Sequence, residues 1–148
     1  MKRLLVLISI FCALVSQSAT AQTDYPLLLA GSDHARWNFT LERGTLSLTG
    51  ICLVRQTEDG LAGSVVNEFG IRAFDFTCHH DKVRVMNVLP QMNRWYIRRL
   101  LRADLRLLAA SKAITPGRRR QLTTYLPDSL LLSNLKYHIN YRFERIKE

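Results

Sequence analysis

The chain has 148 residues, and its 21 Lys and Arg residues outnumber its 12 Asp and Glu residues, which gives a formal net charge of +9. This length is enough for one domain with a sizeable hydrophobic core. Beyond Val15 no apolar run approaches the ~20 residues of a membrane-spanning helix, so further spans are excluded. The positive charge attracts anions such as phospholipid head groups, acidic proteins or nucleic acid.

The N-terminal residues have the three parts of a cleavable secretory signal peptide. Lys2-Arg3 forms a positive start, residues 4–15 form an apolar segment, and Ala19-Thr20-Ala21 is a small-x-small cleavage site. The alternative, an uncleaved anchor helix, is disfavoured because it wants about 20 apolar residues. We therefore expect residues 1–21 to be removed on export to a periplasm and residues 22–148 to form a single domain.

Cys12 suggests a lipoprotein site, in which the acyl chain is attached to a cysteine at the cleavage point. Such sites have a small residue directly before the cysteine, and here that residue is Phe11. We therefore expect a protein that diffuses freely after cleavage. Export also makes nucleic acid the least favoured of the anionic partners.

A run of alternating apolar and polar residues follows, interrupted by short turns that contain Gly or Asp. A period of two is typical of half-buried strands, and short turns join antiparallel neighbours. The five expected strands are residues 36–42, 45–56, 61–68, 71–78 and 82–89.

The register of this meander bears on the two cysteines beyond the signal peptide. It places Cys52 opposite Val65 or Val66 and Cys78 near Leu61. The cysteines then lie on non-adjacent strands, farther apart than the ~7 Å between Cα atoms that a disulfide allows. We predict two free and mostly buried thiols.

After Pro90 the period becomes helical, with Asn93 as the expected N-cap of a helix over residues 94–112. Its apolar stripe comprises Ile97, Leu100, Leu101, Leu105 and Leu108, with Trp95 at its start. A basic face recurs every four residues and comprises Arg94, Arg98, Arg102 and Arg106, widened by Arg99. Asp104 is the only acidic residue in the helix.

The C-terminal part predicts one or two helical turns over residues 118–125, a short strand over 130–132 and a clear strand over 137–143. The fold class is therefore α+β, a curved antiparallel sheet with one long amphipathic helix packed on its concave, apolar face. Phe74 and Phe76 share a strand face and are expected to pack beneath the helix.

The residues that could carry chemistry favour no enzyme. The run from Cys78 to Asp81 contains metal-ligand types, but it occupies a tight turn, and His34 and His138 are isolated, so we expect a solvated turn. Glu68 and Asp75 are interpreted as solvent or turn hydrogen-bonding groups. No nucleophile elbow, phosphate-binding glycine loop or zinc-protease motif occurs. We predict no catalytic residues, cofactor or metal.

The basic helix face allows two interpretations. A charged helix face is usually only solvated, but each basic residue near an anionic membrane surface contributes about 1 kcal/mol of attraction. We predict that Arg94, Arg98, Arg102 and Arg106 contact an anionic membrane surface or an acidic protein.

Five segments of the middle of the chain form a recognisable series. They are Gly50-Ile51, 67–76, 88–93, Tyr96-Ile97 and 104–108. This series resembles envelope proteins of Bacteroidetes-type bacteria, which are similar to the LolA/LolB-like lipoprotein-localisation superfamily. The resemblance covers about residues 45–110.

The resemblance implies an unclosed antiparallel β-barrel with helices as a lid over an apolar cavity that holds acyl chains, and it brings no catalytic residues. Periodicity alone gives the cavity candidates, and a filled core is the alternative for each of them. The candidates are Phe74, Phe76, Trp95, Leu100 and Leu101.

Two functions follow as hypotheses. The first is a periplasmic, non-enzymatic carrier or accessory protein that binds a lipid or lipoprotein acyl group. The alternative is an envelope structural or assembly factor that acts through a protein contact on its basic helix. The carrier requires a cavity between the sheet and the helix over residues 94–112.

Overall fold

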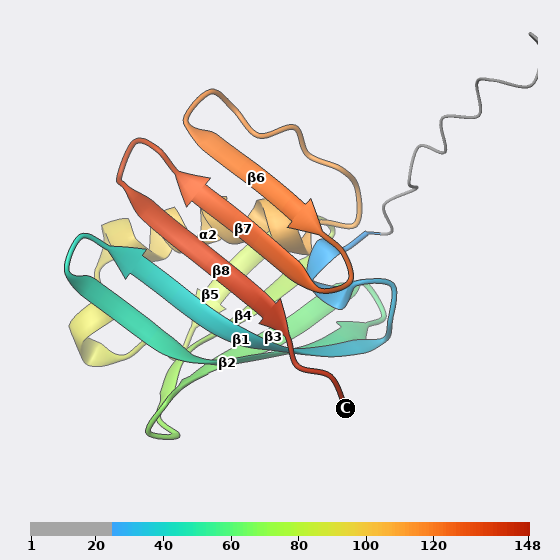
Figure 1. The fold of residues 1–148 in the computed structure, drawn as a ribbon, viewed down its shortest axis with the longest axis horizontal. Coiled ribbons are helices and arrows are strands. Elements are labelled where there is room, and N and C mark those ends of the chain that lie inside the picture. The colour runs from blue at the N-terminus through green and yellow to red at the C-terminus, as the bar shows by residue number, and fades with distance from the viewer. Residues whose placement is uncertain (1–24) are drawn as a thin grey trace, which may run out of the picture.

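The computed structural model describes residues 25–148, and the expected signal peptide lies outside the described residues. One antiparallel sheet of eight strands dominates the fold, in the order β5-β4-β3-β2-β1-β8-β7-β6 (Figure 1). The strands are β1 (His34–Arg43), β2 (Leu46–Thr57), β3 (Gly60–Asn67), β4 (Arg72–His79), β5 (Lys82–Met86), β6 (Arg120–Tyr125), β7 (Ser129–Asn134) and β8 (Ile139–Arg145).

The expected meander of five strands is confirmed by β1 to β5. The predicted register is confirmed as well, because Cys52 pairs with Val65 and Cys78 pairs with Leu61 across neighbouring strands. With β3 between them, the two cysteines form no disulfide, and both thiols are free and buried.

The prediction of helical turns over residues 118–125 is wrong, because β6 occupies most of this segment. Thr123, Thr124 and Tyr125 are residue types that favour strands, and β6 pairs along its whole length with β7. A tight turn joins the two strands, in which Asp128 donates its backbone N–H to the carbonyl oxygen of Tyr125 at 2.8 Å.

The last strand begins two residues later than expected, because Tyr137 and His138 lie in the turn before β8 and His138 has a φ of +55°. This strand pairs antiparallel with β1, and Phe39 stands opposite Phe143. The two rings lie 5.1 Å apart between centroids. The pairing extends the meander into one curled sheet.

The helix α2 spans Trp95–Ala109 and is shorter than expected at its C-terminal end. The predicted N-cap is wrong, because Arg94 takes the N-cap position with an extended backbone and no side chain caps the helix. Asn93 instead ends the short 3-10 helix η3 (Pro90–Met92).

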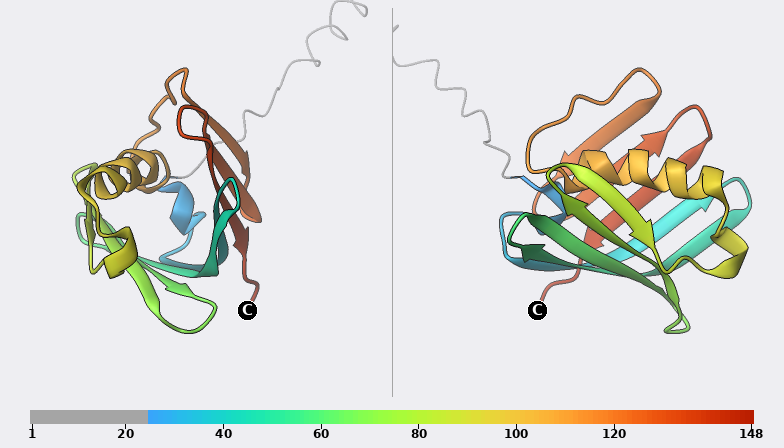
Figure 2. Two further views of the ribbon diagram at one scale, coloured as in Figure 1. Left: turned by 90° about the vertical axis from the view of Figure 1, so that its left-hand side faces the viewer. Right: turned by 180° about the vertical axis from the view of Figure 1, so that it is seen from behind.

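The helix lies across the open side of the curled sheet, where the edge strands β5 and β6 do not pair with each other (Figure 2). It is joined to both edges. Arg98 Nη2 donates to the carbonyl oxygen of Val85 on β5 at 3.1 Å, and Asp104 accepts from Arg120 Nε on β6 at 2.7 Å. The fold is therefore α+β, an unclosed barrel with one helix packed against it.

The core lies between the sheet and the helix. Phe74 and Phe76 are fully buried there, as expected, and full burial of such a ring contributes about 1.5–3 kcal/mol. A second 3-10 helix, η2 (Leu27–Leu29), adds three buried leucines. Trp37 Nε1 holds this segment by donating to the carbonyl oxygen of Leu28 at 2.8 Å.

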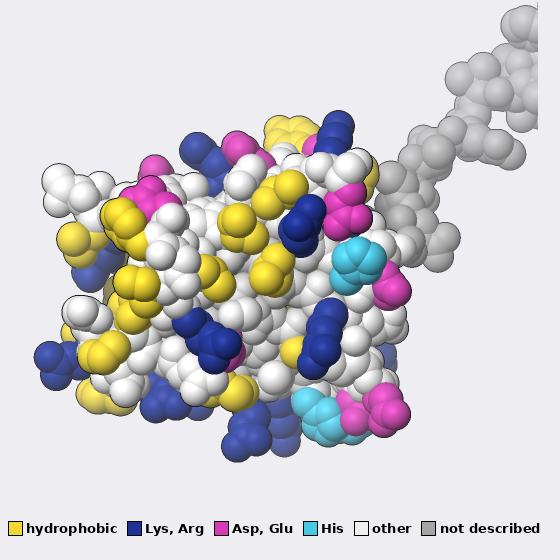
Figure 3. Space-filling model, turned by 90° about the horizontal axis from the view of Figure 1, so that it is seen from below, with side chains coloured by type: hydrophobic (Ala, Val, Ile, Leu, Met, Phe, Trp, Pro, Cys, Tyr) yellow, Lys and Arg dark blue, Asp and Glu magenta, His cyan; other side chains and the backbone are white. Residues whose placement is uncertain are grey.

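The outer face of the sheet carries both apolar and polar side chains (Figure 3). Ile51 and Leu53 on β2 are each 42% exposed. In the view from below, apolar side chains are interspersed with polar groups, and several Lys and Arg side chains lie along one border (Figure 3). Isolated surface apolar residues of this kind are ordinary and require no partner.

Candidate functional site

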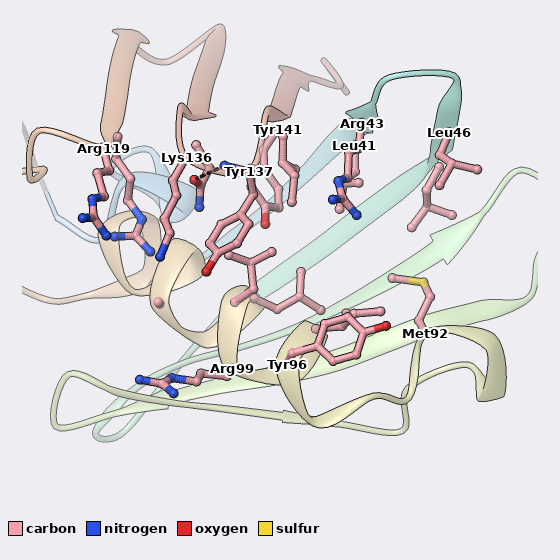
Figure 4. Close-up of a pocket in the computed structure, with 18 of the residues that line it drawn as sticks. Leu41, Arg43, Leu46, Met92, Tyr96, Arg99, Arg119, Lys136, Tyr137 and Tyr141 are labelled. Atoms are coloured by element: carbon pink, nitrogen blue, oxygen red, sulfur yellow. Dashed lines mark hydrogen bonds between the residues drawn. The ribbon is translucent and has the colours of Figure 1, made fainter.

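An open groove of about 870 Å³ lies between the first half of α2 and the inner side of the sheet (Figure 4). Its apolar lining comes from three directions, with Leu41 and Leu48 from the β1–β2 hairpin, Ile97 and Leu100 from α2, and Ile139 from β8. The volume falls within the range of about 300–1,000 Å³ that is typical of small-molecule sites.

Aromatic side chains stand at the mouth of this groove. Trp95 and Tyr96 begin α2 and are 73% and 55% exposed, and their rings make an edge-to-face contact with centroids 6.0 Å apart. Tyr137 approaches from the turn before β8 and also lines the groove. Exposed aromatic groups around a hollow favour a ligand that covers them.

The structure brings together three of the five cavity candidates predicted from the sequence. Trp95, Leu100 and Leu101 all line the groove. Phe74 and Phe76 lie elsewhere, in the filled core, where Phe74 packs against the ring of Phe39 at a centroid distance of 6.5 Å. For these two residues, the side chains occupy the interior and contribute nothing to the groove.

A buried carboxylate organises the polar part of the groove. Asp104 is fully buried and accepts hydrogen bonds from Arg120 Nε at 2.7 Å, Asn134 Nδ2 at 3.1 and 3.2 Å, and the Tyr141 hydroxyl at 2.7 Å. All three donors line the groove, and Asp104 lies behind them. A buried charge costs several kcal/mol unless it is paired and hydrogen-bonded, and here both conditions are met.

This carboxylate also fixes the protonation of its neighbour. Burial, together with the negative charge of Asp104, raises the pKa of the Tyr141 hydroxyl well above its ordinary value. The hydroxyl therefore keeps its proton and remains a donor to Asp104.

The sequence reasoning missed this network, although one signal pointed to it. Asp104 lies three residues after Leu101 and four before Leu108, so it belongs to the apolar stripe and not to the basic face. An acidic residue on the buried side of a helix requires a partner. The partners themselves come from strands 16 to 37 residues away.

The four arginines of the predicted contact face are all exposed, but two of them make hydrogen bonds within the protein. Arg98 and Arg106 donate to backbone carbonyl oxygens of Val85 and Asp81, at 3.1 and 3.2 Å. Arg102 and Arg106 border a second, shallower hollow beside the β4–β5 turn, and Arg94 precedes the helix at its N-cap position.

Of the run from Cys78 to Asp81, only the two histidines lie in a cluster of possible metal ligands, and Asp59 completes that cluster. Ligand atoms of Asp59, His79 and His80 lie within 4.8 Å of one another, and all three residues are exposed. Cys78 instead faces the core, and Asp81 accepts hydrogen bonds from the backbone and side chain of Ser111, both at 2.9 Å. These hydrogen bonds lower the pKa of Asp81 and attach the segment after α2 to the β4–β5 turn.

The two carboxylates considered for acid–base chemistry have local partners. Asp75 accepts from Ser64 Oγ at 2.6 Å and from Asn87 Nδ2 at 2.7 Å. Glu68 accepts from Thr49 Oγ1 at 3.2 Å. Both arrangements are ordinary strand and turn hydrogen bonds.

No protein-family model and no curated protein matches the chain. The resemblance to the LolA/LolB-like superfamily therefore stays a prediction. Within residues 25–148, no helix is both long enough and apolar enough to cross a membrane.

Proposed function

We propose that the protein is a non-enzymatic periplasmic carrier or accessory protein that holds the acyl chain of a lipid or lipoprotein in the groove between α2 and the sheet. The observation that carries this proposal is the open, largely apolar volume of about 870 Å³ beside a core that is otherwise filled. The expected signal peptide and the resemblance to the LolA/LolB-like superfamily support the same function.

The driving force for acyl binding is the removal of apolar surface from water. Each buried methylene contributes about 0.8 kcal/mol, and the exposed faces of Trp95 and Tyr96 would also be covered. The two buried titratable groups of the region, Asp104 and Tyr141, are bonded to each other. This pairing favours a structural role for them over proton transfer to a substrate.

A second candidate function, an envelope assembly factor, draws on the basic side of α2. Arg99, Arg102 and Arg106 border the second hollow together with Lys82, and the charge there favours an acidic partner. This function predicts a salt-sensitive protein contact that is lost in an Arg98→Glu/Arg102→Glu variant, whereas acyl binding in the groove is unaffected.

The groove proposal is tested with a fluorescent fatty acyl probe read by anisotropy, and by native mass spectrometry of protein purified from its own envelope. In Leu48→Trp a bulky ring is placed on the inner side of β2 and should fill the groove. Leu53→Trp adds the same ring to the outer face of the same strand. We expect the wild type and Leu53→Trp to bind the probe and Leu48→Trp to lose most binding. Ligand-free protein that also ignores the probe would refute the proposal.

A further inference from the structure

The charged residues that line the groove are unevenly distributed along it. Figure 4 shows Arg99, Arg119 and Lys136 at one end, and Leu46 and Met92, with Arg43 near Leu46, at the other. The basic end is assembled from α2, the segment before β6 and the turn after β7. Three basic side chains therefore gather at one end, whereas the other end is mostly apolar and carries one basic side chain, Arg43, which pairs with Leu46 across the β1–β2 hairpin (Figure 4).

The basic end is held in place by the backbone. Leu135 donates its N–H to the carbonyl oxygen of Arg119 at 2.7 Å, which brings the segment before β6 beside the turn that carries Lys136. The next residue, Arg120, is fixed by its ion pair with Asp104. Two cationic side chains are thus presented side by side on anchored segments.

The positive charge at this end is not neutralised within the described chain. Among residues 25–148, the ion pairs that join a basic side chain to a carboxylate include none from Arg99, Arg119 or Lys136. The groove lining contains no Asp or Glu, although it contains five basic residues, the other two being Arg43 and Arg120. Like charges around one hollow repel each other, and an anion among them removes this repulsion.

We propose that the ligand is a single-chain amphiphile with an anionic head group, a carboxylate or a phosphate. This inference rests on the proposed acyl-binding function and specifies its ligand. The head group accepts hydrogen bonds from Arg99, Arg119 and Lys136, and the chain extends along the apolar lining toward Met92 and Leu46. Charge-assisted hydrogen bonds of this type are about twice as strong as neutral ones and fix the orientation of the ligand.

The same charges favour a free anionic lipid over the acyl group of a lipoprotein. A chain that is attached to a protein through an uncharged ester or amide offers no anion to the basic end. The groove would then hold the chain while three cationic side chains stay unpaired. The head group therefore determines selectivity, and the apolar lining determines that a chain is bound at all.

The experiment compares ligands with the same chain and different heads. Hexadecanoate, hexadecyl phosphate and hexadecanol compete with the fluorescent acyl probe below their aggregation concentrations, and inorganic phosphate is the chainless control. We expect both anionic ligands to bind about tenfold more tightly than hexadecanol, and we expect added salt to narrow this difference. Inorganic phosphate alone should leave the probe bound.

A pair of matched variants locates the effect. Arg119→Gln/Lys136→Gln removes two charges from the basic end, whereas Arg118→Gln/Arg142→Gln removes two exposed charges outside the groove. The first variant should lose most of the preference for anionic heads while its affinity for hexadecanol is unchanged, and the second should behave as wild type.

Three results would overturn the inference. Equal binding of hexadecanol and hexadecanoate would refute the anionic head group and leave acyl binding intact. Displacement of the probe by inorganic phosphate would indicate an anion site that needs no chain. Failure of every chain-bearing ligand to displace the probe, or of the probe to bind, would refute the proposed function itself.

Discussion

Tyr141 donates its hydroxyl hydrogen to Asp104 across 2.7 Å and so joins the middle of β8 to the middle of α2. The same carboxylate accepts from Arg120 and Asn134, on β6 and β7. One buried charge therefore fixes the helix against three strands of the sheet edge that faces it. Because these three donors also line the groove, the hydrogen-bond network that attaches the helix to this sheet edge also shapes the candidate binding site.

We expect Asp104→Asn to lower the free energy of unfolding by about 2–4 kcal/mol. Removing one partner of a buried ion pair typically costs 3–5 kcal/mol, and the partial exposure of Arg120 reduces that cost. Urea denaturation measures the change. Asp128→Asn is the control, because the side chain of Asp128 makes an exposed 3.7 Å pair with Lys147, and the substitution should change stability by under about 0.5 kcal/mol. Equal effects of the two substitutions would contradict a structural role for Asp104.

The features predicted correctly from the sequence are those encoded by neighbours along the chain. The hairpins from β1 to β5 join adjacent segments, so alternation and turn residues are sufficient to place Cys52 opposite Val65. Helical spacing likewise identified Trp95, Leu100 and Leu101, which line the groove.

Most of the features that were missed depend on contacts between distant segments, and no local pattern reveals that β8 pairs with β1. The β6–β7 hairpin is local, but its strand pairing overrides the weak helical pattern after Arg118. Arg119 and Lys136 lie in connecting segments without periodicity. They reach the groove only because β6, β7 and β8 pair in one sheet, so their role could not be predicted from spacing.

We expect Tyr141→Phe to destabilise the protein by about 1.5–3 kcal/mol, the usual cost of losing a hydrogen bond to a charged group. The ring stays in place and only the hydroxyl group is removed, so packing is preserved. Urea denaturation again measures the loss. Tyr125→Phe, at an exposed position on β6, is the control and should be neutral. If Tyr141→Phe also leaves the free energy of unfolding unchanged, water replaces the lost donor and the hydrogen bond from Tyr141 to Asp104 does not stabilise the fold.

The buried thiol of Cys52 should make stability depend on alkaline pH. Burial raises the pKa of this thiol from 9.0 to about 12. Below pH 9 both the folded and the unfolded chain hold the proton, so the contribution of the thiol is fully present. Between pH 9 and 12 only the unfolded chain releases it, so stability falls with rising pH, at a limiting slope of about 1.4 kcal/mol per pH unit.

The measurement compares urea unfolding of wild type and Cys52→Ala from pH 8 to pH 10.5. Other alkaline groups, including Tyr141, titrate in both proteins, so the difference in unfolding free energy isolates Cys52. This difference should shrink as the pH rises above 9. A difference that stays constant across the range would show that the thiol ionises equally in the folded and unfolded states.

Gly63 on β3 is predicted to be intolerant of even a methyl group. A Cβ atom at this position would lie 2.3 to 2.9 Å from three atoms of the Phe76 ring, which is fully buried and cannot move without disturbing the core. Gly63→Ala should therefore cost about 1–3 kcal/mol, as overpacking typically does. Gly117→Ala is the matched control, because a Cβ there meets no atom within 4 Å. Thermal and urea unfolding of both variants should show a loss only at Gly63; equal stability would mean that the Phe76 ring has room to shift.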